Sequence, residues 1–230
     1  MGLSIIRNTR VKFQDFLKKI AARVDKRSFG NKEFVIIANN CWGAEIYKRL
    51  DREYNTPFVG LFLYGEDYVR LLENFDTYMS YPLSFINSSK WFKQTSTYPI
   101  GLLNDIEIHF LHYKSNDEAQ LKWTRRVTRM NQVRDKNNYF FKICDNALTD
   151  ETLIHRFHQL PFKNKISFSI KNLKITEHIY LVDYEHLGFV PNGVALYIIT
   201  YRYVDLLNWI KTGKFSNNLY SRTKAILRIT

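Results

Sequence analysis

Short apolar runs alternate with helical segments from residue 31 onward, and this alternation restricts the folds open to the chain. β-Branched and aromatic runs predict strands at residues 34–38, 58–64, 83–86, 106–113 and 139–144. Helical spacing of apolar residues predicts helices at 44–53, 66–79, 116–130 and 150–160. Strands and helices that alternate this closely indicate βαβ units and a mainly parallel sheet. We therefore predict an α/β fold, Rossmann-like, with three layers.

The last third of the chain is richer in predicted strands, at residues 166–170, 179–182 and 194–200. We expect a strand-rich C-terminal extension of the sheet, followed by a helix at 204–211. The predicted organisation is a single α/β domain between two basic ends. The basic N-terminal helix covers 1–30, the domain 31–200, and the basic helical tail 201–230. The 230 residues, 45% of them hydrophobic, suffice for one such core.

The net charge of +12 is concentrated at the two ends of the chain. Residues 1–30 contain eight Lys or Arg against two Asp, and residues 201–230 contain six against one. The 170 residues between them are almost neutral. A nucleic-acid-binding domain usually carries its positive charge on the fold itself, so we expect no nucleic-acid partner.

The N-terminal segment has the pattern of a basic amphipathic helix. Phe13, Leu17, Ile20 and Val24 recur at helical spacing, with Phe16 beside them and Lys or Arg on the other faces. Such a helix suits an anionic membrane surface, which we expect as a partner of the basic ends. The alternative is that the apolar stripe packs on the domain.

Targeting features point to the cytoplasm, with attachment at the inner face of the membrane. The N-terminus lacks the charge order of a signal peptide, and the apolar runs at 58–64 and 194–201 are too short to span a bilayer. Two cysteines, Cys41 and Cys144, indicate a reducing compartment rather than a disulfide framework. The chain has no Cys-x-x-Cys, GxGxxG or Walker A string, so neither a metal site nor a standard nucleotide loop is predicted.

A polar loop follows the first predicted strand and is our first candidate site. Ligands of open α/β sheets bind at the carboxyl ends of the strands. The loop contains Asn39, Asn40, Cys41 and Trp42. A helix N-terminus favours the thiolate form of Cys41, and the two amides could hold an oxyanion or a sugar hydroxyl. Helix capping by Asn and burial of Cys41 as a small hydrophobe are the structural alternatives.

Ionisable residues alternate along the predicted strand at 106–113. Because side chains alternate between faces, Asp105, Glu107 and His109 are expected on one face. Two carboxylates and an imidazole suit general acid–base chemistry, although a half-exposed strand has the same pattern. His112, near the strand end, is a separate candidate base.

The helix at 116–130 carries four cations on one face, which could bind a phosphate or an anionic sugar. These are Lys122, Arg125, Arg126 and Arg129. A solvated face is the alternative, because Glu118 is placed to pair with Lys122.

Several long strings resemble a bacterial domain-of-unknown-function family, numbered nineteen-nineteen. They are FVIIANNCWGAEIYKRL, TPFVGLFLYGEDYVRLLEN, YPIGLLNDIEIHFLHYKSNDEAQLKWTRRVTRMN and LPFKNKISF, covering roughly residues 33–170. Members of this family are associated with exopolysaccharide and capsule biosynthesis. The resemblance implies attention to the candidates above, together with Trp123 and Asn131, without assigning their roles.

These features together predict a transferase that builds or decorates a surface polysaccharide, acting on a glycan or lipid-linked sugar. In acyl transfer, His109 or His112 would act as base, oriented by Glu107 or Asp105. The loop at 39–41 would bind the carbonyl, and Lys122, Arg126 and Arg129 would hold the phosphates of a coenzyme A thioester or of a lipid-linked sugar. Glycosyl transfer from a nucleotide sugar is the alternative enzyme. A non-catalytic scaffold is the other alternative, since a scaffold need not bring Cys41, Glu107 and His109 to one pocket.

Overall fold

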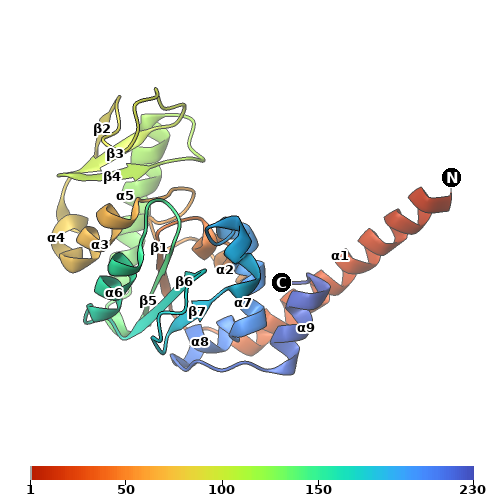
Figure 1. Cartoon of the computed structure of the whole chain (residues 1–230). Coiled ribbons are helices and arrows are strands. Elements are labelled where there is room, and N and C mark those ends of the chain that lie inside the picture. Colours follow the sequence, from red (N-terminus) through yellow and green to blue (C-terminus); the bar gives the residue numbers. More distant parts are fainter. Residues whose placement is uncertain (1) are drawn as a thin grey trace.

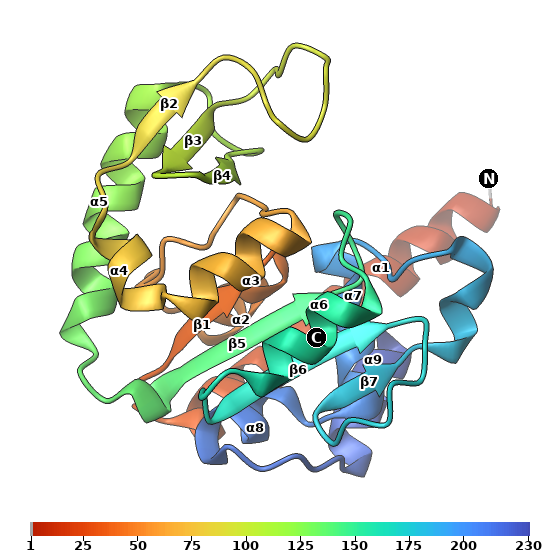
Figure 2. The same ribbon diagram turned by 60° about the vertical axis from the view of Figure 1, so that its left-hand side comes forward.

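A four-stranded, entirely parallel sheet forms the centre of the computed structural model (Figures 1 and 2). The structure describes residues 2–230, and side chains from residue 11 onward. The strands, in spatial order, are β1 (Val35–Ala38), β5 (Tyr139–Cys144), β6 (Asn164–Ser169) and β7 (His178–Tyr180). The predicted parallel α/β fold is therefore confirmed.

Helices cover both faces of this sheet and create two apolar cores. Side chains of β5 alternate, so that Phe141 enters one core and Phe140 the other. The first core contains α3 (Gly65–Glu73), α5 (Asn116–Gln132) and α6 (Glu151–Gln159). The second contains α2 (Trp42–Leu50), α7 (Gly193–Tyr203) and α8 (Leu206–Thr212). The result is the three-layer arrangement that the alternation of elements predicts.

A small antiparallel sheet lies beyond α3 (Figure 2), and in the chain it falls between α4 (Phe75–Ser80) and α5. It consists of β2 (Ser84–Ile86), β3 (Ile100–Leu103) and β4 (Ile106–His109). The predicted strand at 58–64 is reduced to one bridge between Phe62 and His109. The predicted helix at 66–79 is divided at Asn74, and β3 was not predicted.

The strand predicted at 194–200 is wrong, because these residues belong to helix α7. The side chain of Asn192 caps this helix by accepting a hydrogen bond from the backbone N–H of Ala195 at 3.2 Å. Most of α7 is buried, so its sequence is apolar on nearly every side and shows no helical period. After β7 the chain forms η2 (Val182–Leu187), α7, α8 and α9 (Leu219–Leu227), with no further strand in the described residues.

Residues 201–230, predicted as a basic tail, pack against the domain. Helix α9 lies against α7 and beside α1 (Gly2–Phe29), and Gln14 of α1 donates a hydrogen bond to the carbonyl of Leu227. The N-terminal part of α1 projects away from the body of the molecule (Figure 1). Among residues 2–230, no helix combines the length and apolarity needed to cross a bilayer.

Candidate functional site

A crevice lies at the carboxyl ends of β1 and β5, where the chain leaves the two strands toward opposite faces of the sheet. The two strands are neighbours in the sheet, but β1 leads into α2 on one face and β5 into α6 on the other. Such a switch point is where open α/β sheets bind ligands. A cavity of about 810 Å³ occupies this position. Its walls come from the loops after β1 and β5, the first turns of α7, and the segments around Phe62 and Leu111. The lining residues are Asn39, Asn40, Cys41, Phe62, Tyr64, Leu111, His112, Asn146, Ala147, Asn192, Gly193, Val194, Ala195 and Ile198.

Beneath the cavity lies a lysine that we did not predict as a site residue. Lys142 of β5 is fully buried. Its Nζ donates to Oδ1 of Asn39 at 3.1 Å, to Oδ1 of Asn40 at 3.0 Å and to Sγ of Cys144 at 3.0 Å. Burial lowers the pKa of Lys142, because desolvation penalises the ammonium form. Lys142 therefore determines the direction in which both amide groups point.

The amides of Asn39 and Asn40 differ in what remains available to a ligand. Nδ2 of Asn40 donates to Sγ of Cys144 at 3.3 Å, and its Oδ1 also accepts from the backbone N–H of Trp42. Nδ2 of Asn39 is buried and has no hydrogen-bond partner among the described residues. A buried amide without a hydrogen-bond partner lowers the stability of the folded chain. Such groups are more often found at functional sites than in the structural core.

The thiol of Cys41 lines the cavity but is not activated. Its Sγ lies 3.9 Å from the carbonyl oxygen of Leu61. Burial raises the pKa of Cys41, and this outweighs the opposing effect of Lys142. The neutral thiol is thus the favoured form, contrary to the thiolate expected from its position before helix α2. Cys41 is suited to a weak hydrogen bond with a ligand rather than to nucleophilic attack.

Among the residues that line the cavity, His112 is the side chain capable of general-base catalysis. It is exposed, and its backbone N–H donates to the carbonyl of Gly60 at 3.1 Å. Gly60 has a φ of +74°, so this turn favours glycine. The same segment holds Cys41 through Leu61, which brings the thiol and the imidazole to one cavity.

Helix α7 points its N-terminus into the cavity. Gly193 packs so closely on α2 that a Cβ at this position would lie 2.7 Å from the backbone nitrogen of Trp42. Side chains of the first turn, Val194 and Ala195, form part of the wall. Asn192 already accepts from the N–H of Ala195, whereas the N–H groups of Gly193 and Val194 have no intrahelical acceptor and attract negative charge.

His109 and Glu107 lie behind the cavity wall, apart from Cys41. The His109 ring stacks on Phe62 with centroids 4.6 Å apart and meets Tyr64 edge-on at 5.2 Å. Both rings line the cavity, whereas His109 and Glu107 do not. Nε2 of His109 is 3.4 Å from a carboxylate oxygen of Glu107. Burial lowers the pKa of His109 to about 4, so the ring is neutral at pH 7.

Glu107 secures the loop that covers this histidine. Its carboxylate accepts from the Ser89 hydroxyl at 2.6 Å and from the backbone N–H of Lys90 at 2.7 Å. Buried Asp67 accepts from Lys90 Nζ at 2.6 Å and from Trp91 Nε1 at 2.9 Å. These contacts hold Trp91 in a stack on Tyr64, at 4.7 Å between centroids. In this structure Glu107 supports the aromatic wall of the cavity.

Asp105 is separated from the other two ionisable residues of its segment. It lies in the turn before β4, where its exposed carboxylate pairs with Arg70 and accepts from the Tyr78 hydroxyl at 2.9 Å. The expected row of three on one strand face is therefore wrong at Asp105, because the strand begins one residue later.

The cationic residues of α5 do not reach the cavity. Lys122 pairs with Glu118 at 2.6 Å. Arg126 is buried and donates to the Tyr113 hydroxyl and the Val59 carbonyl. Arg129 donates to the carbonyl of Tyr54 at 3.1 Å and pairs with Glu53. The side chains expected to hold phosphates are thus already engaged by the protein.

Two further candidates, Trp42 and Asn131, do not line the cavity. The Trp42 side chain is fully buried, and its Nε1 donates to the Thr200 hydroxyl at 3.0 Å. Asn131 is exposed near the end of α5, outside the cavity. Among the described residues, no group of three or more His, Cys, Asp and Glu side chains is placed to hold a metal ion.

Sequence reasoning missed part of the site. Asn146 lies two residues after the end of β5, as Asn40 lies two residues after the end of β1. Asn192 was hidden by the strand wrongly predicted after it. Lys142 is a lone cation within an apolar strand, which is itself a signal because an unpaired buried lysine is rarely tolerated.

Comparison with known proteins identifies a family for this chain and names no activity. The family model described as "Domain of unknown function (DUF1919)" matches residues 12–211. An uncharacterized protein of Haemophilus influenzae is 38% identical over 160 residues, which is 70% of this chain and 73% of the relative. The matched residues include β1 to β7, both walls of the cavity and the first turns of α7. The chain therefore belongs to the DUF1919 family.

Proposed function

We propose that the cavity between β1 and β5 transfers an acyl group to a hydroxyl of a glycan or glycan precursor, in the biosynthesis of a bacterial surface polysaccharide. The observation that carries this proposal is that a candidate base, His112, lines the same cavity as an apolar wall and several asparagine side chains. These asparagines come from the loops after β1 and β5 and from the residue before α7. Asparagine side chains suit sugar hydroxyls, because an amide both donates and accepts hydrogen bonds. The apolar wall suits an acyl chain.

The proposed chemistry uses a coenzyme A thioester as donor. The His112 imidazole removes the proton from a sugar hydroxyl, whose oxygen attacks the thioester carbonyl carbon. The negative charge that develops on the carbonyl oxygen is stabilised by N–H groups at the start of α7. The carbon–sulfur bond then breaks, the ester is released, and the leaving thiolate takes the proton from His112.

The lining residues favour this reaction over metal-dependent glycosyl transfer. They are amides, one imidazole, one thiol, aromatic rings and aliphatic side chains. Acyl transfer requires a base and hydrogen-bond donors, whereas metal-dependent transfer of a sugar requires carboxylate ligands for the ion.

Glycosyl transfer from a nucleotide sugar is a second candidate, favoured by one observation. The N-terminus of α7 faces the cavity, and a helix N-terminus is suited to the phosphate of such a donor. His112 would then activate the acceptor hydroxyl in the same way.

The proposed compartment is the cytoplasm. Cys41 and Cys144 are both free thiols in the structure, as suits a reducing environment. Coenzyme A thioesters and nucleotide sugars would serve as donors there.

Thermal unfolding with acetyl-coenzyme A and with a panel of nucleotide sugars tests the proposal, because a ligand bound only by the native state raises Tm. A rise with the coenzyme supports acyl transfer, and a rise with one sugar nucleotide supports glycosyl transfer. His112→Gln should retain binding while losing release of the coenzyme thiol to a sugar acceptor. His186→Gln, at an exposed histidine outside the cavity, is the matched control. A rise with neither donor class would contradict both activities and favour a scaffold.

A further inference from the structure

An apolar stripe on helix α1 faces solvent rather than the domain. Phe13 is 61% exposed, Phe16 58%, Ile20 40% and Val24 49%. These residues follow one another at the three- and four-residue spacing of a single helix face. Large exposed apolar patches mark interaction sites, whereas single exposed hydrophobic residues do not. Leu17, the other apolar residue of this segment, is half-buried. The alternative that the stripe packs on the domain is therefore wrong for Phe13, Phe16, Ile20 and Val24.

The same helix contacts the domain through a different face. Ala21, Asp25 and Phe29 are buried and recur every four residues. Ala21 follows Ile20, and Asp25 follows Val24, so the buried face is turned by about 100° from the apolar stripe. The stripe is thus free on a helix that already has its packing partner.

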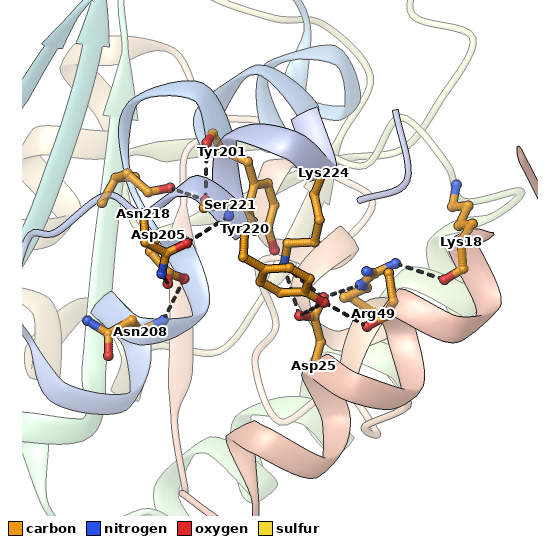
Figure 3. Close-up of polar contacts among 12 residues, drawn as sticks. Lys18, Asp25, Arg49, Tyr201, Asp205, Asn208, Asn218, Tyr220, Ser221 and Lys224 are labelled. Atoms are coloured by element: carbon orange, nitrogen blue, oxygen red, sulfur yellow. Dashed lines mark hydrogen bonds and ion pairs between the residues drawn. The ribbon is translucent and has the colours of Figure 1, made fainter. Parts of the chain in front are cut away.

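A buried ion cluster fixes α1 to the domain (Figure 3). The Asp25 carboxylate accepts from Arg49 Nε of α2 at 2.7 Å, and from Lys224 Nζ of α9 at 2.8 Å. The Tyr220 hydroxyl of α9 donates to the same carboxylate at 3.1 Å. Asp25 and both cationic side chains are almost completely buried. The helix therefore presents its stripe in a fixed direction relative to the domain.

Basic residues border the exposed stripe. Lys12, Lys19, Arg23 and Arg27 are all exposed and lie on the flank away from the buried face. Asp15 is the one exposed acidic residue among the described side chains of α1, since Asp25 is buried. Aromatic and aliphatic side chains beside an excess of cations suit a surface that has an apolar interior beneath an anionic outer layer.

We infer that α1 lies in the surface of an anionic lipid bilayer, with Phe13, Phe16, Ile20 and Val24 in the acyl boundary. The flanking Lys and Arg side chains contact lipid phosphates. Charge complementarity favours an anionic bilayer as the partner of the stripe, because each Lys or Arg near an anionic surface strengthens binding. The cavity site plays no part in this attachment.

Flotation of the full chain with lipid vesicles tests the inference. Binding is expected to phosphatidylcholine vesicles that contain phosphatidylglycerol, and to weaken on removing that lipid or raising the salt concentration. Phe13→Asn with Phe16→Asn should lower the partition coefficient by about tenfold or more, because both rings lose their contact with lipid. Leu121→Asn, at a residue of α5 that is 68% exposed, is the matched control and should bind as wild type does.

Three results would overturn the inference. Equal binding to vesicles with and without phosphatidylglycerol would remove the role of charge. Wild-type binding by the double phenylalanine variant would remove the role of the stripe. A wild-type chain that fails to float with vesicles, and that forms a dimer by analytical ultracentrifugation which the double variant converts to a monomer, would assign the stripe to a second copy of the chain. Because the substituted residues are exposed, circular dichroism and Tm should match wild type in each variant.

Discussion

Nζ of Lys142 lies 3.0 Å from Oδ1 of Asn40, which joins the middle of strand β5 to the loop after strand β1. The same ammonium group also holds Asn39. A fully buried lysine with a lowered pKa thus sets the geometry of two amides in the cavity wall.

Asn39→Ala should lower the free energy of unfolding by about 2–3 kcal/mol, because it leaves a buried ammonium short of an acceptor. Burial lowers the pKa of Lys142 in the folded chain, so unfolding takes up a proton at pH values between that lowered pKa and the ordinary value of 10.5, and stability rises with pH across this window. The deficit of Asn39→Ala should therefore shrink with rising pH, in urea unfolding at pH 7 and pH 10. Asn131→Ala, at an exposed asparagine, is the control and should stay within about 0.5 kcal/mol of wild type.

Asp25→Asn should lower the free energy of unfolding by about 3–5 kcal/mol. The substitution leaves Arg49 and Lys224 as buried cations without their carboxylate. Urea unfolding measures the change, with Asp15→Asn on the exposed side of the same helix as control. Equal stability of the two variants would show that the buried cluster does not hold α1 to the domain.

Stability should fall as pH decreases from about 6.5 to about 4, in part because of His109. Burial lowers the pKa of His109 to about 4. Between pH 6.5 and pH 4 this histidine is therefore protonated in the unfolded chain and neutral in the folded chain. The contribution of this one group reaches at most about 3 kcal/mol. His109→Gln should make the loss between pH 7 and pH 4.5 smaller, measured by urea unfolding. The exposed His186→Gln variant should follow the wild-type pH profile, and identical profiles for all three proteins would contradict the assignment.

Arg126→Leu should lower the free energy of unfolding by about 1–2 kcal/mol, whereas Arg125→Leu should change it by less than about 0.5 kcal/mol. Arg126 is buried against Tyr113 and Tyr54, and its neighbour Arg125 is exposed. Chemical unfolding of the two variants compares them directly. If Arg126 instead bound a ligand phosphate, its loss would reduce donor affinity and leave stability unchanged.

The sequence predicted the parallel sheet because its short apolar strands alternate with helical segments. It also predicted the start of α5, where the Ser115 hydroxyl accepts from the backbone N–H of Glu118 at 3.2 Å. Helix α7 was not predicted, because a helix that is apolar on nearly every side has the same apolar run as a buried strand. Its cap, Asn192, was the available signal.

The candidate site was predicted only in part. The loop after β1 could be found, since position after a buried strand is visible in sequence. Alternation placed Glu107 and His109 together, but it could not show that Phe62 and Tyr64 separate them from the cavity. Contacts of this kind join segments far apart in the chain, and a single sequence carries no period that reports them.

Binding of acetyl-coenzyme A by a cavity-blocked variant tests the central claim most directly. Ala195→Phe places a ring in the cavity wall on α7, and Thr124→Phe places the same ring on the exposed surface of α5. In isothermal titration calorimetry, wild type and Thr124→Phe should bind the coenzyme with equal affinity, and Ala195→Phe should lose binding by at least about tenfold. Binding by Ala195→Phe equal to that of wild type, or no binding by any of the three, would contradict the assignment of this cavity as the donor site.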